Sequence, residues 1–181
     1  MPHKFQMPQK YIDRMVERLG REHVQETLET DKTALVVVDM QNYFMDESQL
    51  AGCPVGQTIV DNVNRIADVV RQTGGMVIWL QNFIPDHSTE TWKAAHERYS
   101  PKNQEVRLKS MKPCTWPFEF WPTLDIREED HQIIKRRYSA FIQGSSDIEL
   151  ILTDNGIENI IICGVATNVC CDSTARDAMM L

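Results

Sequence analysis

A short run of β-branched residues constrains the fold of this chain more than any other feature. Residues Thr33 to Val38 read Thr-Ala-Leu-Val-Val-Val, and the charged Asp39 follows directly. A strand without alternating polar positions is typical of a parallel sheet that is covered on both faces. The run therefore predicts a buried parallel strand that ends at Asp39.

A helix and a second strand follow this run. From Gln57 to Thr73 the apolar residues recur at helical spacing, and Gly74-Gly75 supplies a stop signal. Met76 to Leu80 then form another apolar run. Strand, helix and strand in this order indicate a right-handed parallel crossover. We expect an α/β fold with a doubly wound, mainly parallel sheet and helices on both faces, in a Rossmann-like three-layer arrangement.

Residues 83–130 interrupt this alternation. They contain a predicted helix near Glu90 to Tyr99 and an aromatic, proline-rich stretch from Pro113 to Pro122. A connection of this length usually shapes a binding site, so we assign 83–130 as a substrate-shaping insertion. The alternation then resumes with a strand at Gln132 to Lys135, a helix near Asp147 to Asn155, a strand at Asn159 to Cys163 and a helix from about Asn168.

Both ends of the chain lie outside this pattern. Residues 8–28 predict a polar helical arm with one apolar stripe, so we separate residues 1–32 from a compact domain at 33–181. We expect the arm to pack on the domain or on a partner subunit, and the protein to be a homo-oligomer. The chain stops at Leu181 inside the last predicted helix, which suggests a truncated or processed product whose sheet could lack its closing strand.

Composition narrows the possible partners. A net charge of −7 repels polyphosphate, and no run approaches the roughly 18 apolar residues of a membrane span, so we expect neither nucleic acid nor membrane as a partner. No secretory or transit pattern is visible, which favours the cytoplasm. Five cysteines without C-x-x-C spacing and five scattered histidines indicate reduced thiols, no metal site and no cofactor.

Three reactive residues follow predicted strands, where the functional crevice of an open α/β sheet lies. Asp39 follows the first strand, Lys135 ends the third, and Cys170 follows the fourth. We expect Cys170 in the first turn of the last helix, where unpaired N–H groups would lower its pKa and favour a thiolate. Cys171 lies about 100° further round that helix and is the candidate for a core position.

Each of these residues also has a structural interpretation. Asp39 could be a loop carboxylate or helix cap, Lys135 a solvated member of the run Lys135-Arg136-Arg137, and Cys170 a small buried thiol. In the functional interpretation Asp39 is a general base. Its pKa is raised by partial desolvation and lowered by the ammonium group of Lys135.

The segment Gly164-Val-Ala-Thr-Asn-Val-Cys-Cys-Asp-Ser-Thr-Ala-Arg-Asp-Ala178 strongly resembles the nucleophile segment of isochorismatase-like cysteine hydrolases. Ala34 to Phe44 and Lys135 to Phe141 agree in order and setting. The resemblance implies a catalytic triad of Asp39, Lys135 and Cys170. It also implies a cis peptide bond between Val165 and Ala166, and an oxyanion hole formed by the backbone N–H groups of Ala166 and Cys170.

The resemblance also implies a reaction. It predicts a cysteine hydrolase that cleaves an amide or ureido C–N bond of a small metabolite through a Cys-linked acyl intermediate and releases ammonia or an amine. Trp79 to Asn82 and Arg137-Tyr-Ser look most similar to ureidoacrylate amidohydrolases, whereas Gln81 to His87 lacks the metal ligands of nicotinamidases. The residues that we expect to line the substrate pocket are Asn42, Phe44, Trp79, Asn82 and Tyr138.

Two other functions remain open. One is the hydrolysis of the vinyl ether of isochorismate, which needs acid catalysis rather than a sulfur nucleophile. The other is a catalytically silent oligomerisation or regulatory subunit, in which the triad fills a vestigial cleft.

Overall fold

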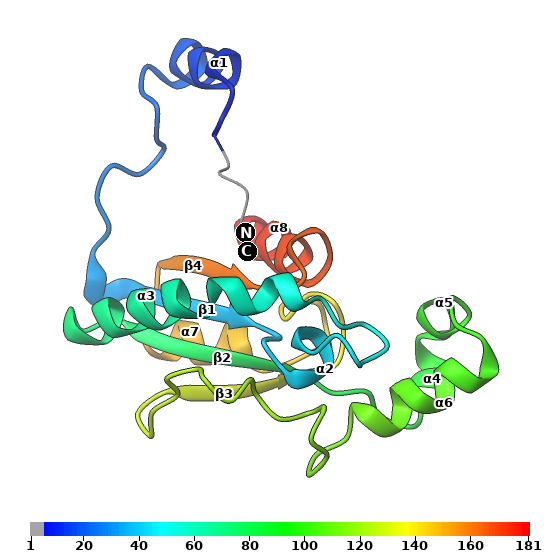
Figure 1. Cartoon of the computed structure of the whole chain (residues 1–181). Coiled ribbons are helices and arrows are strands. Elements are labelled where there is room, and N and C mark those ends of the chain that lie inside the picture. The colour runs from blue at the N-terminus through cyan, green and yellow to red at the C-terminus, as the bar shows by residue number, and fades with distance from the viewer. Residues whose placement is uncertain (1–5) are drawn as a thin grey trace.

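The centre of the molecule is a four-stranded parallel sheet, seen in a computed structural model that describes residues 6–181 (Figure 1). The strands are ordered β3-β2-β1-β4, and every neighbouring pair is parallel. They are β1 (Thr33–Val38), β2 (Met76–Asn82), β3 (His131–Lys135) and β4 (Asn159–Gly164). All six residues of β1 are buried, which confirms the strand predicted from the β-branched run.

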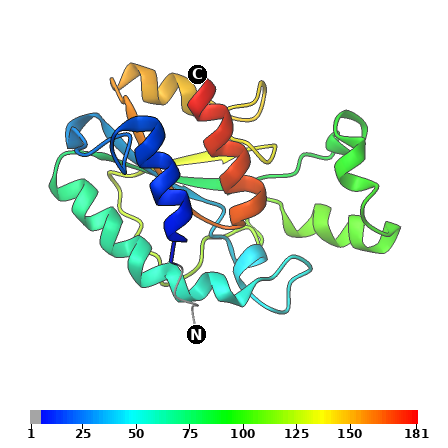
Figure 2. The same ribbon diagram turned by 90° about the horizontal axis from the view of Figure 1, so that it is seen from above.

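Helices cover both faces of this sheet. Helix α3 (Val60–Gln72) packs on one face, and α7 (Ile148–Asp154) packs on the other, beside α8 (Asp172–Met180) (Figure 2). Alternate residues of β1 point to opposite layers, as the pleat of a strand requires: Leu35 packs with the α3 layer and Val36 with the α7 layer. The predicted doubly wound, three-layer α/β fold is confirmed.

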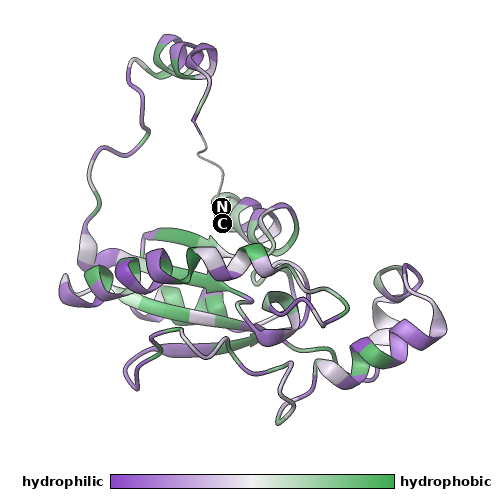
Figure 3. Cartoon of the chain, viewed as in Figure 1, coloured by the Kyte–Doolittle hydropathy of each residue, from purple (hydrophilic) through white to green (hydrophobic). Residues whose placement is uncertain are grey.

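The hydropathy of the strands follows their place in the sheet. In Figure 3 the inner strands β1 and β2 are mostly hydrophobic, whereas the edge strand β3 is largely hydrophilic. The other edge strand, β4, is half-buried along its whole length. Short and partly polar edges are the usual way in which sheets limit pairing with other chains. No helix within residues 6–181 is long and apolar enough to cross a membrane.

The insertion forms a lobe that projects from the sheet (Figures 1 and 2). The single helix predicted near Glu90 to Tyr99 is wrong, because Trp92 has φ −140° and separates two short helices, α4 (Ser88–Thr91) and α5 (Lys93–His96). A longer helix, α6 (Pro101–Ser110), was not predicted. Its start has a local signal, since the Ser100 hydroxyl accepts the N–H of Asn103 and proline occupies the first helical position.

The N-terminal arm is a shorter helix than predicted. Helix α1 (Gln9–Leu19) ends where Gly20 takes a left-handed conformation with φ 72° and donates its N–H to Val16. The helix expected over 8–28 is therefore wrong beyond Leu19, because a glycine cap of this kind closes the last turn. No residue of α1 is buried, and α1 stands away from the sheet in Figure 1. Residues 1–5 of the predicted arm lie outside the described residues.

The remaining short elements surround the carboxyl ends of the strands or precede β1. They are η1 (Thr30–Lys32), α2 (Asn42–Met45), η2 (Pro54–Ile59) and the π-helical turn η3 (Thr167–Cys171). The chain between β4 and η3 depends on Gly164, which has φ 112°. A Cβ atom there would lie 2.2 Å from the carbonyl oxygen of Val38. Only glycine allows β4 to end this close to the end of β1.

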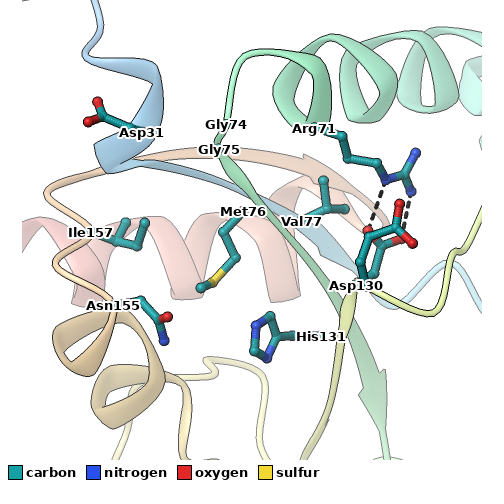
Figure 4. A pocket seen from close by; sticks show the side chains of 11 residues that line it. Asp31, Arg71, Gly74, Gly75, Met76, Val77, Asp130, His131, Asn155 and Ile157 are labelled. Carbon is teal, nitrogen blue, oxygen red and sulfur yellow. Dashed lines mark hydrogen bonds and ion pairs between the residues drawn. The ribbon is translucent and has the colours of Figure 1, made fainter.

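An ion-pair network joins the amino-terminal side of the sheet to the end of the insertion. Arg71 of α3 donates to both carboxylate oxygens of Asp130, at 2.9 and 2.6 Å (Figure 4). The indole N–H of Trp79 donates to the same carboxylate at 2.8 Å. Asp130 therefore fixes α3 and β2 to the segment that leads into β3. The cavity drawn in Figure 4 is lined by Met76 and His131, which begin β2 and β3.

Candidate active site

Asp39 lies at the point where β1 ends. Its side chain is fully buried, and its φ of 50° is a left-handed conformation that non-glycine residues seldom adopt, although aspartate tolerates it better than most. The Asp39 N–H donates to the carbonyl of Leu80 in β2 at 3.1 Å, so the turn stays attached to the sheet. Unusual backbone conformations that the surrounding structure holds in place are frequent at functional sites.

Lys135 is the last residue of β3 and is also fully buried. Its Nζ atom lies 2.8 Å from Oδ2 of Asp39 and donates to the carbonyl of Arg137 at 3.0 Å. The interpretation of Lys135 as a solvated lysine is therefore wrong. Strand β2 lies between β1 and β3, so the ion pair passes the end of β2, where Asn82 is close enough to Asp39 to lower the pKa of its carboxylate.

Cys170 completes the cluster from the opposite edge of the sheet. It lies in the π-helical turn η3, one residue before that turn ends and α8 begins, and it is 5% exposed. Its thiol is close enough to both Asp39 and Lys135 for each of them to shift its pKa. The Sγ atom of Cys171 instead lies 3.9 Å from the carbonyl of Cys163 in β4, so Cys171 faces the core. The structure thus brings together the three residues that the sequence singled out.

Burial sets the protonation of this cluster. Burial raises the pKa of Asp39, against the neighbouring ammonium group of Lys135, which lowers it. Burial alone would lower the pKa of Lys135, but Asp39 and Cys170 outweigh it and raise that pKa. Burial and the Asp39 carboxylate together raise the pKa of Cys170. The lowered pKa expected from a helix start is wrong, and Cys170 rests as a thiol.

The connection before η3 has the backbone form that the resemblance implied. The peptide bond between Val165 and Ala166 is cis. The carbonyl of Ala166 accepts the N–H groups of Val169 and Cys171, whereas the amide of Ala166 has no hydrogen-bond partner among residues 6–181. An amide without a partner beside a nucleophile is able to donate to a developing oxyanion.

The residues expected to line the substrate pocket lie in different environments, and three of them are buried. Asn82 lies beside Asp39, and Asn42 is buried, with its amide donating to the carbonyl of Trp116 at 2.8 Å and its Oδ1 atom unpartnered. Trp79 is fully buried in the α3 layer, where Phe120 packs edge-to-face on its ring. Its N–H is already bound to Asp130, so packing accounts for Trp79 and we leave it out of the proposed site.

Phe44 and Tyr138 are both half-buried. The Phe44 ring packs edge-to-face on Tyr43, with 5.0 Å between ring centroids, and belongs to the rim of the core. Tyr138 packs on Trp92 at 4.6 Å, and its hydroxyl accepts a hydrogen bond from Arg98 at 2.9 Å. Among the residues expected to line the pocket, Tyr138 is thus the one whose side chain connects the segment after Lys135 to the insertion at residues 83–130.

The side chain of Gln41, a residue not singled out from the sequence, connects the segments that surround Asp39. Its amide donates to the carbonyls of Phe118 and Asn82 at 2.8 and 3.2 Å, and its Oε1 atom accepts the N–H of Asn82 at 2.8 Å. Gln41 therefore fixes the end of β2 and the end of the insertion beside Asp39. Its place two residues after Asp39, at a strand end, was a signal that could have identified it.

A cavity of about 340 Å³ lies along the segments that follow Lys135 and Cys170 in the sequence, although neither residue lines it. It is lined by Trp92, Arg137, Tyr138, Ser139, Ile142, Ser173, Arg176 and Asp177. Ser173 and Asp177 follow Cys170 by three and seven residues, which places them on nearly the same side of the helix. A cavity of this size suits a small metabolite. The cavity of Figure 4 is instead at the amino-terminal edge of the sheet.

Ligands for a metal ion do not converge in this region. Within the described part of the chain, no group of three or more histidine, cysteine, aspartate or glutamate side chains is placed to hold one.

The fold and the buried cluster define the class of protein. It is a three-layer α/β protein with a parallel sheet, and its reactive side chains meet at the carboxyl edge of that sheet. Residues 33–181 match the isochorismatase domain, and this chain belongs to the isochorismatase family of hydrolases.

Individual relatives agree with this assignment. The chain is 32% identical over 168 residues to the ureidoacrylate amidohydrolase RutB of Klebsiella variicola (strain At-22), a match covering 86% of this chain and 70% of that protein. It is 33% identical over 150 residues to a probable inactive nicotinamidase of Arabidopsis thaliana, covering 82% of this chain and 74% of the relative. The crystal structure of a cysteine hydrolase from Pseudomonas syringae pv. phaseolicola 1448A superposes with a TM-score of 0.75 at 25% identity, over 87% of this chain and 70% of that one.

Proposed function

We propose that this chain is an amidohydrolase that cleaves the C–N bond of a ureido acid or a related small amide through an acyl intermediate on Cys170. The observation that carries the proposal is the meeting of Asp39, Lys135 and the Cys170 thiol in one buried cluster at the carboxyl edge of the sheet. A nucleophile within reach of a base, with a third group that orients the base, is the usual arrangement for covalent catalysis.

The first half-reaction uses Asp39 as the base. Asp39 takes the proton of the Cys170 thiol, and the sulfur forms a bond to the carbonyl carbon of the substrate. The oxygen of that carbonyl becomes an anion, which the amides of Ala166 and Cys170 stabilise. Loss of one such donor typically raises the barrier by about 2.7 to 4 kcal/mol. Asp39 then returns the proton to the departing nitrogen, the C–N bond breaks, and ammonia or an amine leaves.

The second half-reaction regenerates the thiol. Asp39 removes a proton from water, and the resulting hydroxide attacks the thioester or thiocarbamate carbon. The C–S bond breaks, and the sulfur of Cys170 takes the proton from Asp39. Lys135 stays positively charged throughout and balances the carboxylate of Asp39 whenever that group is ionised. Because Cys170 rests as a thiol, substrate binding and proton transfer to Asp39 must accompany the attack.

The substrate class is inferred from the relatives and from the cavity lined by Arg137 and α8. Proteins named ureidoacrylate amidohydrolase share about a third of their residues with this chain. Arg176 of this cavity is already paired with Asp172, and Asp177 adds a carboxylate to the lining, so Arg137 is the group that favours a negative charge on the substrate. A ureido group with a carboxylate at the other end of the molecule fits both observations.

A substitution pair tests this mechanism. Ammonia release is measured over a panel of ureidoacrylate, N-carbamoyl amino acids, carbamates and simple amides, with wild type, Cys170→Ala and Cys171→Ala. We expect Cys170→Ala to lower turnover by roughly 10³-fold or more. Cys171→Ala removes a neighbouring buried thiol that faces the core and serves as the matched control.

Mass spectrometry of the intact protein during turnover identifies the intermediate. We expect an acyl adduct on wild type and on Cys171→Ala, and none on Cys170→Ala. Turnover that survives in Cys170→Ala at the wild-type rate would refute the mechanism.

A catalytically silent subunit is the second candidate. Two observations favour it: the nucleophile is almost fully buried, and a relative of similar identity is named as a probable inactive nicotinamidase. Alkylation with iodoacetamide distinguishes the two functions. If the chain is an enzyme, iodoacetamide should alkylate Cys170 and turnover should fall in parallel. If it is a silent subunit, no substrate of the panel should be turned over and Cys170 should not react. Vinyl-ether hydrolysis needs no thiol, so it would leave Cys170→Ala active on isochorismate.

A further inference from the structure

The insertion lobe contains a buried positive charge that nothing in the described chain balances. Arg107 of α6 is 6% exposed, and its side chain makes no hydrogen bond and no ion pair within residues 6–181. Its Nη1 atom is fully enclosed without a partner. The nearest favourable contact is the ring of Tyr99, 5.3 Å from the guanidinium carbon. A guanidinium nitrogen that is enclosed without a partner is destabilising, so such a residue requires an explanation.

Two other buried polar atoms beside Arg107 also have no partner. Tyr43 of α2 is 1% exposed, and His96 of α5 is 3% exposed. The Tyr43 hydroxyl and the Nδ1 atom of His96 are both enclosed without a hydrogen bond among the described residues. Leu108, which follows Arg107, packs in one hydrophobic cluster with Tyr43. Tyr99, whose ring contacts the Arg107 guanidinium, donates its N–H to the carbonyl of His96 at 3.0 Å. Three elements that are separate in the sequence thus bring three unsatisfied groups to one place.

All three groups can donate a hydrogen bond. Burial raises the pKa of Tyr43 to about 12, so the phenol keeps its proton near neutral pH. Burial and Arg107 lower the pKa of His96, so its imidazole is neutral and carries one N–H. The Nε2 atom of His96 lies 2.9 Å from the hydroxyl of Ser88, and when that hydroxyl donates, the proton of His96 is on Nδ1. The cluster then presents donors only, around a net positive charge.

We infer that Arg107, Tyr43 and His96 form a buried binding site for a carboxylate. An Arg fork suits a carboxylate, which offers two acceptor oxygens in one plane, and a hydroxyl and an imidazole N–H can satisfy the lone pairs that remain. Occupation by a carboxylate would pair every unsatisfied atom of the cluster and neutralise the charge. Cations and neutral donors would leave the guanidinium unbalanced, and the planar Arg fork matches the two oxygens of one carboxylate.

The site lies at the same edge of the sheet as the catalytic cluster. Tyr43 follows Asp39 by four residues, which limits the separation of their Cα atoms to about 14 Å. Ile84, which packs on Tyr43, follows Asn82 by two residues. The carboxylate therefore comes from one of two sources: the substrate itself, or a free carboxylate that binds beside the active site.

Acetate is the probe for the binding itself, which does not depend on the proposed hydrolase activity. Thermal unfolding of the full chain is followed over an acetate titration, with chloride at equal ionic strength as the reference. A ligand that binds only the folded state raises the unfolding temperature with its concentration. We expect a saturable rise with acetate that chloride does not reproduce, and a several-fold weaker response in Tyr43→Phe.

Arg107→Met is the decisive variant, and Lys109→Met is its matched control. Both lose one positive charge from α6, but Lys109 is exposed and pairs only with Glu105. We expect Arg107→Met to lose the acetate response and, without acetate, to unfold at the same temperature as wild type or higher, because it removes an unpaired buried charge. Lys109→Met should keep the response. A merely structural arginine would give the opposite: a lower unfolding temperature on substitution.

Kinetics separate the two sources of the carboxylate. If the substrate supplies it, acetate competes with a ureido acid and Arg107→Met raises KM by roughly tenfold or more while kcat changes little. If a free carboxylate supplies it, the unfolding temperature still responds to acetate and KM does not change. An acetate effect equal to that of chloride in wild type, or an equal response in Arg107→Met, would overturn the inference. If Arg107→Met does not fold, Arg107→Lys and Tyr43→Phe give the same comparison.

Discussion

At the scale of single residues, the buried cluster works because each side chain sets the state of the others. Asp39 and Lys135 are both fully enclosed, and a charge of either sign alone would be costly there. As a pair 2.8 Å apart they compensate each other. The carboxylate next to Cys170 raises the pKa of the thiol, and in the proposed mechanism the same group accepts the proton of that thiol.

The ammonium group of Lys135 therefore controls the pH at which Asp39 becomes a base. In the proposed mechanism Asp39 acts in its deprotonated form, so we expect kcat/KM to rise as pH increases through its pKa. That pKa is already raised by burial, and Lys135 is the largest influence that lowers it. We expect Lys135→Met to lower activity and to move the acidic limb of its residual pH profile to higher pH, because the opposing charge is lost.

Arg136→Met is the control for this experiment. Arg136 follows Lys135, and its exposed side chain donates to the carbonyl of Ser145 rather than to Asp39. The substitution therefore removes a positive charge that does not contact Asp39. Its pH profile should match that of wild type. An acidic limb that stays in place in Lys135→Met, or moves equally in both variants, would show that Lys135 does not set the pKa of the base.

At the scale of secondary-structure elements, one ion pair connects layers that the catalytic cluster does not touch. Arg71 and Asp130 have side chains that are 8% and 1% exposed. Burial would raise the pKa of Asp130, but Arg71, the backbone N–H of Arg127 and the indole of Trp79 together hold it below its ordinary value. The pair fixes the segment that leads from the insertion into β3 and therefore the approach of Lys135.

Removing this carboxylate should destabilise the whole domain. We expect Asp130→Asn to lower the free energy of unfolding by about 3 kcal/mol, because it removes the buried carboxylate that pairs with Arg71 and leaves only the more exposed Asp125 as its anion. The contribution of Asp130 in wild type is fully present above the unfolded pKa of about 3.9 and is lost as pH falls through the lower folded pKa. The variant should lack this acid-dependent part.

Urea denaturation at several pH values measures both effects. Glu105→Gln, which breaks the exposed pair between Lys109 and Glu105, is the control and should cost less than about 1 kcal/mol. Equal effects of the two substitutions would contradict the role given to the buried pair.

At the scale of the whole molecule, helix α1 of the N-terminal arm has an apolar stripe that stays exposed in a single chain. Helix α1 exposes Tyr11, Met15, Val16 and Leu19. An isolated helix of eleven residues is marginal in water, and an amphipathic helix normally gains its stability by packing its apolar face. The expected homo-oligomer, in which a second chain covers this stripe, stays a prediction.

Light scattering coupled to size exclusion tests the assembly. We expect a mass that is a multiple of 20.9 kDa, and a smaller species after Met15→Glu with Val16→Glu. Arg14→Glu with Arg18→Glu changes two charged positions of the same helix and is the control for charge. A wild-type mass of one chain at micromolar concentration would contradict the prediction.

The sequence by itself determined the parallel α/β fold and the place of the catalytic candidates. The β-branched run at Thr33 to Val38 has no polar position after Thr33, so it must be covered on both faces, and β1 is buried at every residue. Because parallel strands end at one edge, residues that follow strands meet there, as Asp39, Lys135 and Cys170 do. The ends of α1 and α6 also had local signals in Gly20 and in Ser100-Pro101, which the prediction did not use.

Only the tertiary structure decided how these residues are solvated. The pKa of Cys170 rises because the core and Asp39 surround the thiol, and this outweighs the position before a helix on which the prediction relied. Trp79 is part of the core because Asp130, 51 residues away, binds its indole. The donors of Arg107, Tyr43 and His96 converge from three separate elements. Desolvation depends on residues that are distant in the sequence, and no local pattern records it.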